Sequence, residues 1–192
     1  MTDFDPGALL AETGALLTGH FRLSSGRHSD VFVQKFRLLE NPAPTQRCAQ
    51  ALAARFDDGF DVVASPAVGA LVLGWATALA AGTRSVFAER VDGRMVFRRG
   101  FRLEPGERVV VVEDVVTTGG SAREVVDLVR AAGAVPVGVG ALVDRSDPAA
   151  PPPVGAPLRA LVRLEATSWD PASCPGCRSG APLEDPGSRR LP

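Results

Sequence analysis

The chain has 192 residues, of which 45% are hydrophobic, and a formal net charge of −1. The hydrophobic fraction excludes a disordered protein, and the length predicts one domain with a sizeable core. The near-neutral charge gives no overall attraction to nucleic acid or to an anionic membrane. We expect no secretory signal, because the first six residues are acidic, and the longest apolar run, 67–82, is too short to span a bilayer comfortably. These features favour a cytoplasmic enzyme.

The first half of the chain alternates helical and extended patterns. The Asp5-Pro6 pair is a good N-cap and first-turn pair for a helix, and residues 24–27, Ser-Ser-Gly-Arg, are typical of a bend between two strands. The expected elements are a helix through about residue 17, a hairpin over 20–36, a helix from 42 to about 56, a strand over 61–64, a helix over 67–81 and a strand over 84–88.

The second half continues the alternation. We expect a strand over 109–112, a helix to about residue 132 and a strand over 135–143, followed by an irregular Pro-rich tail over about 146–192. Alternating strands and helices predict an α/β fold, with a central parallel sheet covered by helices on both faces. Ligands bind beyond the carboxyl ends of such strands. The polar residues expected at these ends are Ser65, Glu89, Glu113 and Asp144.

The most informative stretch is residues 109–121, which reads VVVVEDVVTTGGS. Four valines suit a buried strand, two acids follow, and a turn of hydroxyl residues and glycines leads into a helical pattern. A helix N-terminus offers backbone N–H groups and partial positive charge to a phosphate. The acids would repel that phosphate but accept hydrogen bonds from sugar hydroxyls. The pattern therefore indicates a ligand that carries a phosphate beside a ribose.

Other interpretations of this stretch are weaker. Ser121 or Thr118 could be a simple N-cap, but two acids between a valine run and the turn make a plain capped helix a poor explanation. No Gly-Lys-Ser/Thr follows, so the turn is not a Walker A loop, and it is not a dinucleotide fingerprint. Gly138 and Gly140 lie in an apolar run, where they indicate close packing of a strand.

With strand, acids and turn in this order, the stretch resembles the phosphoribosyl-pyrophosphate (PRPP) motif of type I phosphoribosyltransferases. The resemblance implies that Glu113 and Asp114 hold the ribose hydroxyls, that the turn holds the 5-phosphate, and that Asp114 is catalytic. It also implies a small N-terminal hood at about 19–40 on a single domain of 1–192. The implied PRPP-binding residues are Arg90, Glu113, Asp114, Val115, Val116, Thr117, Thr118, Gly119, Gly120 and Ser121.

Residues 19–34 are similar to the hood segment of the orotate branch of this family. There an aromatic ring packs near the base, which makes Phe32 the candidate; an inward-facing hairpin residue is the plain alternative. Relatives often carry a lysine where this chain has Ser24, so Arg27 or Lys35 would have to replace it. Residues 65–70 resemble the loop that cradles pyrophosphate, although a lysine found there in relatives is absent.

Residues 89–100 form a basic, glycine-bearing segment, for which a solvated hairpin is the default interpretation. The resemblance implies a mobile loop that closes over the neighbouring subunit's site in a homodimer. Arg90 would contact pyrophosphate, and Arg94 stands where many relatives have a catalytic lysine. A histidine common in relatives is replaced by Val96, which leaves charge stabilisation as the role of this loop.

Arg145 ends a predicted buried strand beside Asp144, and an internal ion pair is the plain interpretation of the two. In the orotate branch an arginine at this point meets the base carboxylate, and Thr117 also contacts the base. A guanidinium forms charge-assisted hydrogen bonds with a carboxylate. A neutral purine base has no carboxylate and would not need an arginine at this point.

The resemblance implies an orotate phosphoribosyltransferase activity. Orotate and PRPP would give orotidine 5-phosphate and pyrophosphate on the way to UMP, with Mg²⁺ held mainly through PRPP rather than by a direct protein ligand. The implied partners are these two substrates and a second copy of the chain, with no nucleic acid and no membrane. Two alternatives stay open: a phosphoribosyltransferase for another base, and a PRPP-sensing regulator without turnover.

Cys174 and Cys177 form a Cys-Pro-Gly-Cys pair that looks like half of a zinc knuckle. The sequence holds only two histidines, His20 and His28, so a structural zinc would need a second pair of ligands from another chain. We therefore expect free thiols in a turn. The odd number of cysteines excludes a disulfide framework.

Overall fold

The computed structural model describes residues 4–23, 25–165 and 167–186. The chain divides into two compact units: a large one, up to Pro6 and over 41–164, and a small one, over 7–40 and from residue 165 on. Ser24, placed at the predicted bend, and Ser188 and Arg189 of the tail lie outside the described residues. The single domain expected from the sequence stays a prediction.

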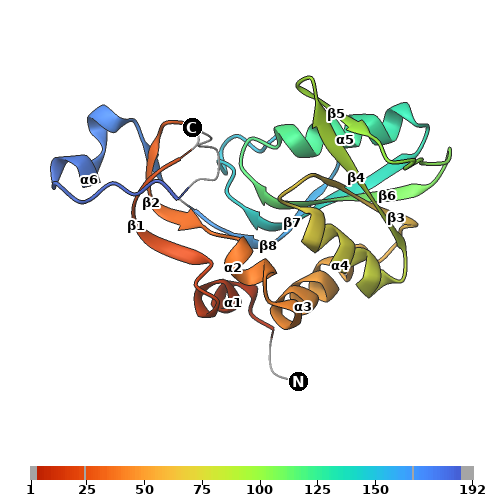
Figure 1. Ribbon diagram of the computed structural model, residues 1–192, viewed down its shortest axis with the longest axis horizontal. Helices are drawn as coiled ribbons and strands as arrows, with labels where there is room; N and C mark the ends of the chain where they lie inside the picture. Colours follow the sequence, from red (N-terminus) through yellow and green to blue (C-terminus); the bar gives the residue numbers. More distant parts are fainter. Residues whose placement is uncertain (1–3, 24, 166, 187–192) are drawn as a thin grey trace. The chain divides into compact units, whose positions relative to one another are not determined.

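The large unit is built on a six-stranded sheet with the order β5-β4-β3-β6-β7-β8 (Figure 1). Five strands are parallel to their neighbours, and β5 pairs antiparallel with β4 at the edge. The predicted α/β class with a mainly parallel sheet is therefore confirmed. The strands are β3 (Val62–Pro66), β4 (Arg84–Val91), β5 (Arg94–Phe97), β6 (Arg108–Val116), β7 (Val135–Asp144) and β8 (Leu158–Arg163).

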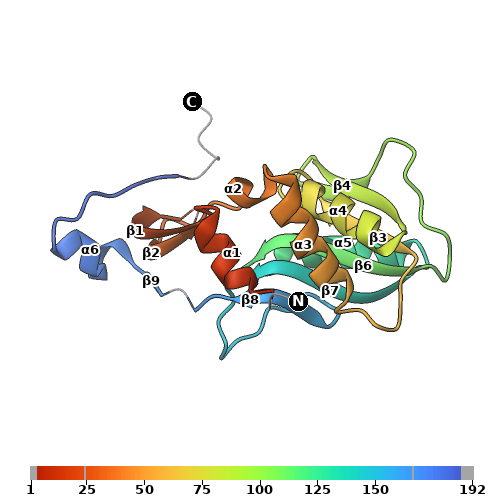
Figure 2. The ribbon, with the colours of Figure 1, turned by 90° about the horizontal axis from the view of Figure 1, so that it is seen from below.

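Helices cover both faces of this sheet, as predicted. Helix α5 (Gly120–Ala131) packs on one face, and α3 (Pro42–Ala53) and α4 (Leu71–Ala81) pack on the other (Figure 1). Seen from below, α3 crosses in front of the strands (Figure 2). None of the described helices combines the length and the apolar character needed to cross a bilayer.

The core explains the four consecutive valines, 109–112. All four are fully buried, because strand β6 lies at the centre of the sheet and is covered on both faces. On the neighbouring strand, a Cβ atom at Gly138 would lie 2.5 Å from the Phe56 ring, and one at Gly140 would lie 3.2 Å from Leu52. The close packing predicted at these glycines is confirmed. The side chains that approach β7 belong to α3 and to the turn that follows α3.

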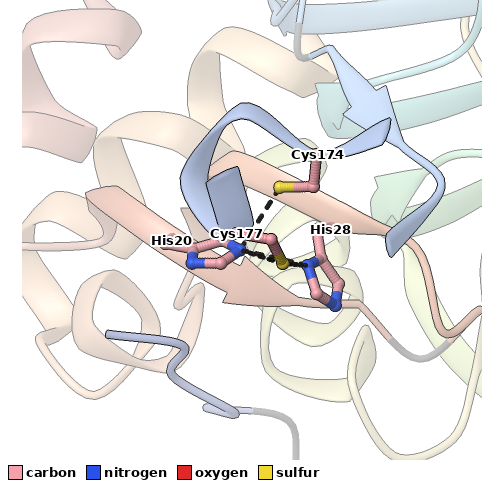
Figure 3. A group of neighbouring side chains, drawn as sticks. All are labelled: His20, His28, Cys174 and Cys177. Carbon is pink, nitrogen blue, oxygen red and sulfur yellow. Dashed lines mark hydrogen bonds between the residues drawn. The ribbon is translucent and has the colours of Figure 1, made fainter. Parts of the chain in front are cut away.

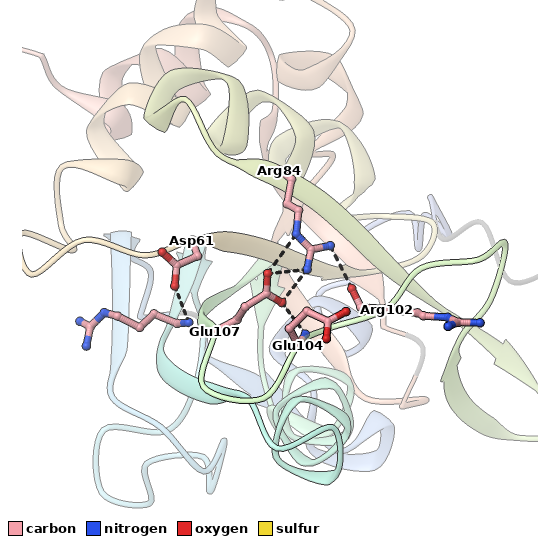
Figure 4. A network of polar contacts seen from close by, with 6 residues as sticks. Asp61, Arg84, Arg102, Glu104 and Glu107 are labelled. Carbon is pink, nitrogen blue, oxygen red and sulfur yellow. Dashed lines mark hydrogen bonds and ion pairs between the residues drawn. The ribbon is translucent and has the colours of Figure 1, made fainter.

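A polar network closes the amino-terminal edge of the sheet (Figure 4). Arg84, which begins β4, pairs with Glu107 at 2.5 Å and donates to the Arg102 carbonyl at 2.9 Å. The Asp61 carboxylate accepts from the Arg108 backbone N–H at 2.8 Å. The Arg84 guanidinium, as a hydrogen-bond donor, lowers the pKa of the Glu107 carboxyl. These charges balance one another at the end of the sheet that faces away from the predicted site.

The sequence predicted an irregular tail from about residue 146, but part of this segment is a regular strand. Residues 158–163 form β8, which pairs with β7 and completes the large sheet. The five prolines that suggested an irregular tail are confined to the connection over 147–157, and a strand with four apolar residues and two arginines follows them. Composition averaged over the whole tail concealed this six-residue strand.

The small unit contains a three-stranded sheet with the order β1-β2-β9. Its first helix ends at Glu12 rather than near Leu17, because Gly14 adopts a left-handed conformation with a φ of 66° and stops the helix. The predicted hairpin is present as β1 and β2. The remaining elements are α1 (Pro6–Glu12), β1 (Leu16–Arg22), β2 (His28–Val33), α2 (Phe36–Leu39), β9 (Ser168–Trp169), a 3₁₀ turn (Pro171–Ser173) and α6 (Pro175–Arg178).

Candidate functional site

The acid pair lies inside β6, near its carboxyl end, rather than after the strand. Glu113 and Asp114 are 8% and 5% exposed. One oxygen of Glu113 accepts the Asp114 backbone N–H at 3.0 Å, and one oxygen of Asp114 accepts the Val115 N–H at 2.6 Å. Both carboxylates are therefore buried and oriented by the backbone before any ligand binds.

The turn after β6 delivers an open helix N-terminus. Helix α5 begins at Gly120, and its N-cap is Gly119, whose φ is 73°. A glycine has no side chain with which to occupy the first N–H groups of the helix, and the first turn, 120–123, holds no acidic residue. Thr117 and Thr118 are exposed beside it. The plain interpretation, with Thr118 or Ser121 as the cap, is therefore wrong, and the geometry suits an anion.

Gly119 also fits tightly under a neighbouring segment. A Cβ atom at this position would lie 2.5 Å from Val154 and 3.0 Å from Pro152. Both the positive φ and this contact require glycine. The connection that leads to β8 therefore packs over the turn and limits its conformations.

Arg145 follows β7 immediately and lies at the carboxyl edge of the large sheet, as the acid pair does. Its backbone N–H donates to the Val116 carbonyl at 2.7 Å, which places Arg145 beside the start of the turn and therefore near Thr117. The adjacent Asp144 is 5% exposed and pairs with Arg163 of β8 at 3.5 Å. The internal ion pair of Asp144 thus involves Arg163, a partner that the sequence did not indicate.

A second turn at this edge connects β3 to α4. Residues 67–70 form the turn, so the helix begins at Leu71 rather than at 67. Ser65 is buried, and its hydroxyl has no hydrogen-bond partner among the residues that the structure describes. A Cβ atom at Gly74 would lie 2.8 Å from that hydroxyl, so the helix approaches the strand closely. The turn resembling a pyrophosphate loop therefore lies at the carboxyl end of its strand.

The basic segment 89–100 contains a regular hairpin, which confirms the default interpretation of its sequence. Strands β4 and β5 pair up to Val91 and Arg94, with Asp92 and Gly93 at φ values of 48° and 79° between them. Positive φ at both central residues is typical of a type I′ hairpin turn, and Asp-Gly is a preferred sequence for it. Arg94 is exposed at the start of β5, and Glu89 lies within β4 rather than beyond its end.

Arg90 is held by a residue of α5. Its guanidinium contacts both carboxylate oxygens of Glu124, at 2.7 and 3.2 Å, and Glu124 also accepts the Met95 backbone N–H at 3.2 Å. Donation by Arg90 lowers the pKa of the Glu124 carboxyl. Glu124, which the sequence did not single out, therefore connects the hairpin to the helix whose N-terminus faces the candidate phosphate position.

Phe32 lies in the small unit, on β2. Its ring is half-buried and tilted against Phe21, with 5.8 Å between ring centroids. This contact agrees with the plain alternative of an inward-facing hairpin residue, and a role at the base stays a prediction.

The two cysteines of the Cys-Pro-Gly-Cys pair also lie in the small unit, next to His20 and His28. The expectation that a second pair of ligands would have to come from another chain is therefore wrong. The hairpin brings both histidines of the same chain to the cysteines.

Comparisons with known proteins agree with this architecture. Residues 37–154 match the phosphoribosyl transferase domain family. The chain is 47% identical over the full length of both proteins to the orotate phosphoribosyltransferase of Pelotomaculum thermopropionicum. It is 48% identical to that of Heliobacterium modesticaldum, with 91% of this chain and 92% of the relative covered.

Solved structures give the same result. The orotate phosphoribosyltransferase of Aeropyrum pernix superposes with a TM-score of 0.65 at 27% identity, covering 82% of this chain and 93% of the other. That of Mycobacterium tuberculosis superposes with a TM-score of 0.67 at 25% identity, covering 84% and 97%. Sequence and structural relatives therefore point to one family.

Proposed function

The chain belongs to the orotate phosphoribosyltransferases of the type I phosphoribosyltransferase family, and we propose that the carboxyl edge of its large sheet carries their reaction. The enzyme transfers the ribose 5-phosphate group of PRPP to orotate, giving orotidine 5-phosphate and pyrophosphate in pyrimidine biosynthesis. The observation that supports particular residues for this reaction is the buried acid pair beside an open helix N-terminus.

In this proposal, Glu113 and Asp114 hold the ribose hydroxyls. Hydrogen bonds from hydroxyls to carboxylates are charge-assisted, and burial strengthens them because the local dielectric is low. The backbone N–H groups that fix one oxygen of each acid orient the carboxylates in advance. Less ordering is then needed when PRPP binds, which favours reaction by positioning.

The turn from Thr117 to Ser121, with the backbone of Val115 and Val116 before it, binds the 5-phosphate. N–H groups at the start of α5 point toward that phosphate, and the helix dipole favours its negative charge. The phosphate thereby anchors the ribose at a fixed distance from the acid pair.

Arg145 and Thr117 select the base. The Arg145 guanidinium offers a fork of N–H donors that suits the orotate carboxylate, and the hydrogen bond from its backbone to Val116 places it next to Thr117. Phe32 is the further candidate for packing against the base.

The leaving group gains negative charge as the glycosidic bond breaks, in a transition state with oxocarbenium character. Arg90 and Arg94 offset this charge on pyrophosphate. An arginine does not release its proton readily, so Arg94 acts as a charge stabiliser and not as a proton donor.

The buried carboxylates of Glu113 and Asp114 place negative charge beside the phosphate turn, which favours a cation there without direct coordination by the protein. These residues therefore fit an ion that is bound mainly through PRPP. When bound, Mg²⁺ neutralises charge on the pyrophosphate and orients the ribose oxygens.

A homodimer in the cytoplasm completes the proposal, with hairpin residues 89–100 reaching the neighbouring site. An apolar stripe on α4 supports association with a second copy: Val72, Trp75 and Leu79 are 44%, 61% and 62% exposed. Mixing Arg94→Ala subunits with Asp114→Asn subunits tests the crossing, because a mixed dimer would then hold one intact site. Restored activity is expected, and a confirmed mixed dimer without activity would place each site within one chain.

The direct test is a steady-state assay of the purified protein with PRPP, Mg²⁺ and each of orotate, adenine, hypoxanthine and uracil. We expect orotidine 5-phosphate and pyrophosphate, with kcat/KM for orotate at least about 100-fold above the other bases, because only orotate offers Arg145 a carboxylate. Turnover of a purine instead would assign a different base. PRPP binding without any turnover, together with PRPP-dependent retention of DNA or RNA on a filter, would indicate a regulator.

A further inference from the structure

Four side chains that can bind a metal converge in the small unit, although they come from distant parts of the sequence. His20 and His28 lie on the β1–β2 hairpin, Cys174 is the N-cap of α6, and Cys177 lies within α6 (Figure 3). Their ligand atoms all lie within 4.8 Å of one another. His20, His28 and Cys174 are 7%, 4% and 1% exposed, whereas Cys177 faces solvent and leaves a path for an ion.

Four of the six spacings between the ligand atoms are close to those around a tetrahedral ion. The two ring nitrogens, His20 Nε2 and His28 Nδ1, are 3.0 Å apart. Sulfur-to-nitrogen distances are 3.3 Å from Cys174 to His20, 3.3 Å from Cys177 to His28 and 3.7 Å from Cys177 to His20. A Zn²⁺ ion with bonds of about 2.0–2.1 Å to nitrogen and about 2.3 Å to sulfur places its ligands roughly 3.3–3.8 Å apart. The two imidazoles would move slightly apart, and the widest spacings, which extend to 4.8 Å at most, would shorten around the ion.

Hydrogen bonding alone accounts poorly for the arrangement. His20 Nδ1 lies 3.0 Å from the Ala181 carbonyl, which can only accept, so Nδ1 carries the proton and Nε2 offers one lone pair. Three groups approach that single lone pair: both sulfur atoms and His28 Nδ1. One lone pair cannot accept three good hydrogen bonds, whereas a cation at the centre satisfies all four groups.

The surroundings of His20 are those of an oriented metal ligand. A carbonyl that accepts from the ring nitrogen opposite the ligating one is the usual second contact of a zinc-bound histidine. A β-bulge in β1 between Thr18 and Phe21 lies at this histidine, and bulges redirect side chains. The glycine of the Cys-Pro-Gly-Cys pair is also fitted to the ring, since a Cβ atom at Gly176 would lie 2.8 Å from it.

We propose that His20, His28, Cys174 and Cys177 bind one Zn²⁺ ion and that this ion fastens the C-terminal segment to the N-terminal hairpin. Two thiolates and two imidazoles in a closed tetrahedral set are typical of structural zinc. Binding releases the two thiol protons to solvent and leaves both imidazoles neutral. The ion would act together with the pairing of β9 on β2 and with Glu184, which bonds to the backbone of His20 and Arg22 at 2.8 Å.

The first test measures metal in the full chain, purified without a histidine tag and under reducing conditions. We expect about one Zn²⁺ per chain by plasma mass spectrometry. Replacing zinc with Co²⁺ should give the visible bands of tetrahedral cobalt and a thiolate-to-cobalt charge-transfer band. The cobalt spectrum does not depend on the enzymatic reaction, so this inference can fail while the proposed function holds.

Matched variants then assign the ligands. Cys177→Ser and His28→Asn should each lower the zinc content at least tenfold, while Cys48→Ala should retain it. Cys48 is the suitable control because it is fully buried in α3 of the large unit, where burial raises the pKa of its thiol to about 11. Far-UV circular dichroism identifies any variant that fails to fold.

Two results would overturn the proposal. One is wild-type protein that carries no zinc and shows only octahedral cobalt bands when Co²⁺ is added to its reduced form. The other is a Cys177→Ser variant that keeps both full zinc content and the thiolate-to-cobalt band of the wild type. The first result would leave the cluster as a set of hydrogen-bonded thiols and imidazoles, and the second would remove Cys177 from the ligands of the ion.

Discussion

The two edges of the large sheet hold their charges in opposite ways. At the amino edge, Arg84 and Glu107 are 43% and 20% exposed and pair with each other. At the carboxyl edge, three carboxylates, Glu113, Asp114 and Asp144, are at most 8% exposed. Solvated ion pairs contribute little to stability in either direction, whereas burial of a carboxylate costs free energy that its partners must offset. The amino edge therefore holds solvated ion pairs, and the carboxyl edge retains costly buried groups, of which the proposed function assigns Glu113 and Asp114 to the ribose.

The largest expected effect is that of Asp114→Asn. The amide keeps the shape but loses the charge that orients the ribose, so kcat should fall by about 10²–10³-fold. The midpoint of thermal unfolding should stay the same or rise, because a buried charge has been removed. Asp61→Asn is the control from the opposite edge, where loss of the charge, with an amide oxygen still able to accept from the Arg108 N–H, should leave kcat unchanged. Wild-type kinetics in Asp114→Asn would remove the acid from the site.

Arg145→Ala should weaken orotate selectively. Losing charge-assisted hydrogen bonds to the base carboxylate should raise the orotate KM by about 10- to 100-fold, with little change in the PRPP KM. The control is Arg108→Ala, whose guanidinium donates to the Asp58 and Gly59 carbonyls at the amino edge. An increase confined to the PRPP KM would move Arg145 from the base to the phosphates.

Gly119→Ala separates backbone strain from phosphate binding. Its positive φ and the contact with Val154 should cost about 1–3 kcal/mol of stability, and the displaced turn should raise the PRPP KM. Gly106→Ala is the matched control, because Gly106 has a φ of 85° but no atom within 4 Å of an added Cβ. Both variants should lose stability in urea unfolding. If Gly106→Ala raised the PRPP KM equally, the effect would be general strain.

The smallest effect concerns the amino edge itself. Because Arg84 lowers the pKa of Glu107, this pair stabilises the fold above the ordinary glutamate pKa and loses its effect as pH falls through the lowered value. Glu107→Gln should therefore cost less than about 1 kcal/mol at pH 7, and the cost should shrink in acid. Urea unfolding at pH 7 and in acid measures this cost in stability. Glu104→Gln should show no such pH dependence, because only its backbone joins the network.

Much of the large unit was predictable because its signals are local. Runs of apolar residues, with glycine and proline between them, predicted the strands and helices of the parallel sheet within a few residues. The exceptions have physical reasons. Strand β8 follows five prolines that dominate the composition around it, and the helix expected from residue 67 begins only at Leu71, after a turn. The Asp92-Gly93 dipeptide is a hairpin signal that predicts the β4–β5 turn and was available in the sequence.

The site was predictable to the extent that it lies in one stretch of chain. Glu113 to Ser121 form a continuous motif, so its acids and turn could be placed together. The ion pairs of Arg90 with Glu124 and of Asp144 with Arg163 join different elements, and no local pattern indicates them. The Cys/His cluster was missed for the same reason, although a Cys-Pro-Gly-Cys pair with only two histidines in the chain was a usable signal.

The division of the small unit between both ends of the chain affects how the protein is made. Residues 41–164, which form nearly all of the large unit, are synthesised before β9 and α6 exist. Domains fold as units during synthesis. The large sheet can therefore form before β9 and α6, the segments that pack on the β1–β2 hairpin, have been synthesised. The hairpin must stay accessible, and protected from wrong pairing, until the last part of the unit leaves the ribosome. Completion of the small unit is therefore a late event in the synthesis of the chain, after the strands of the large sheet have been made.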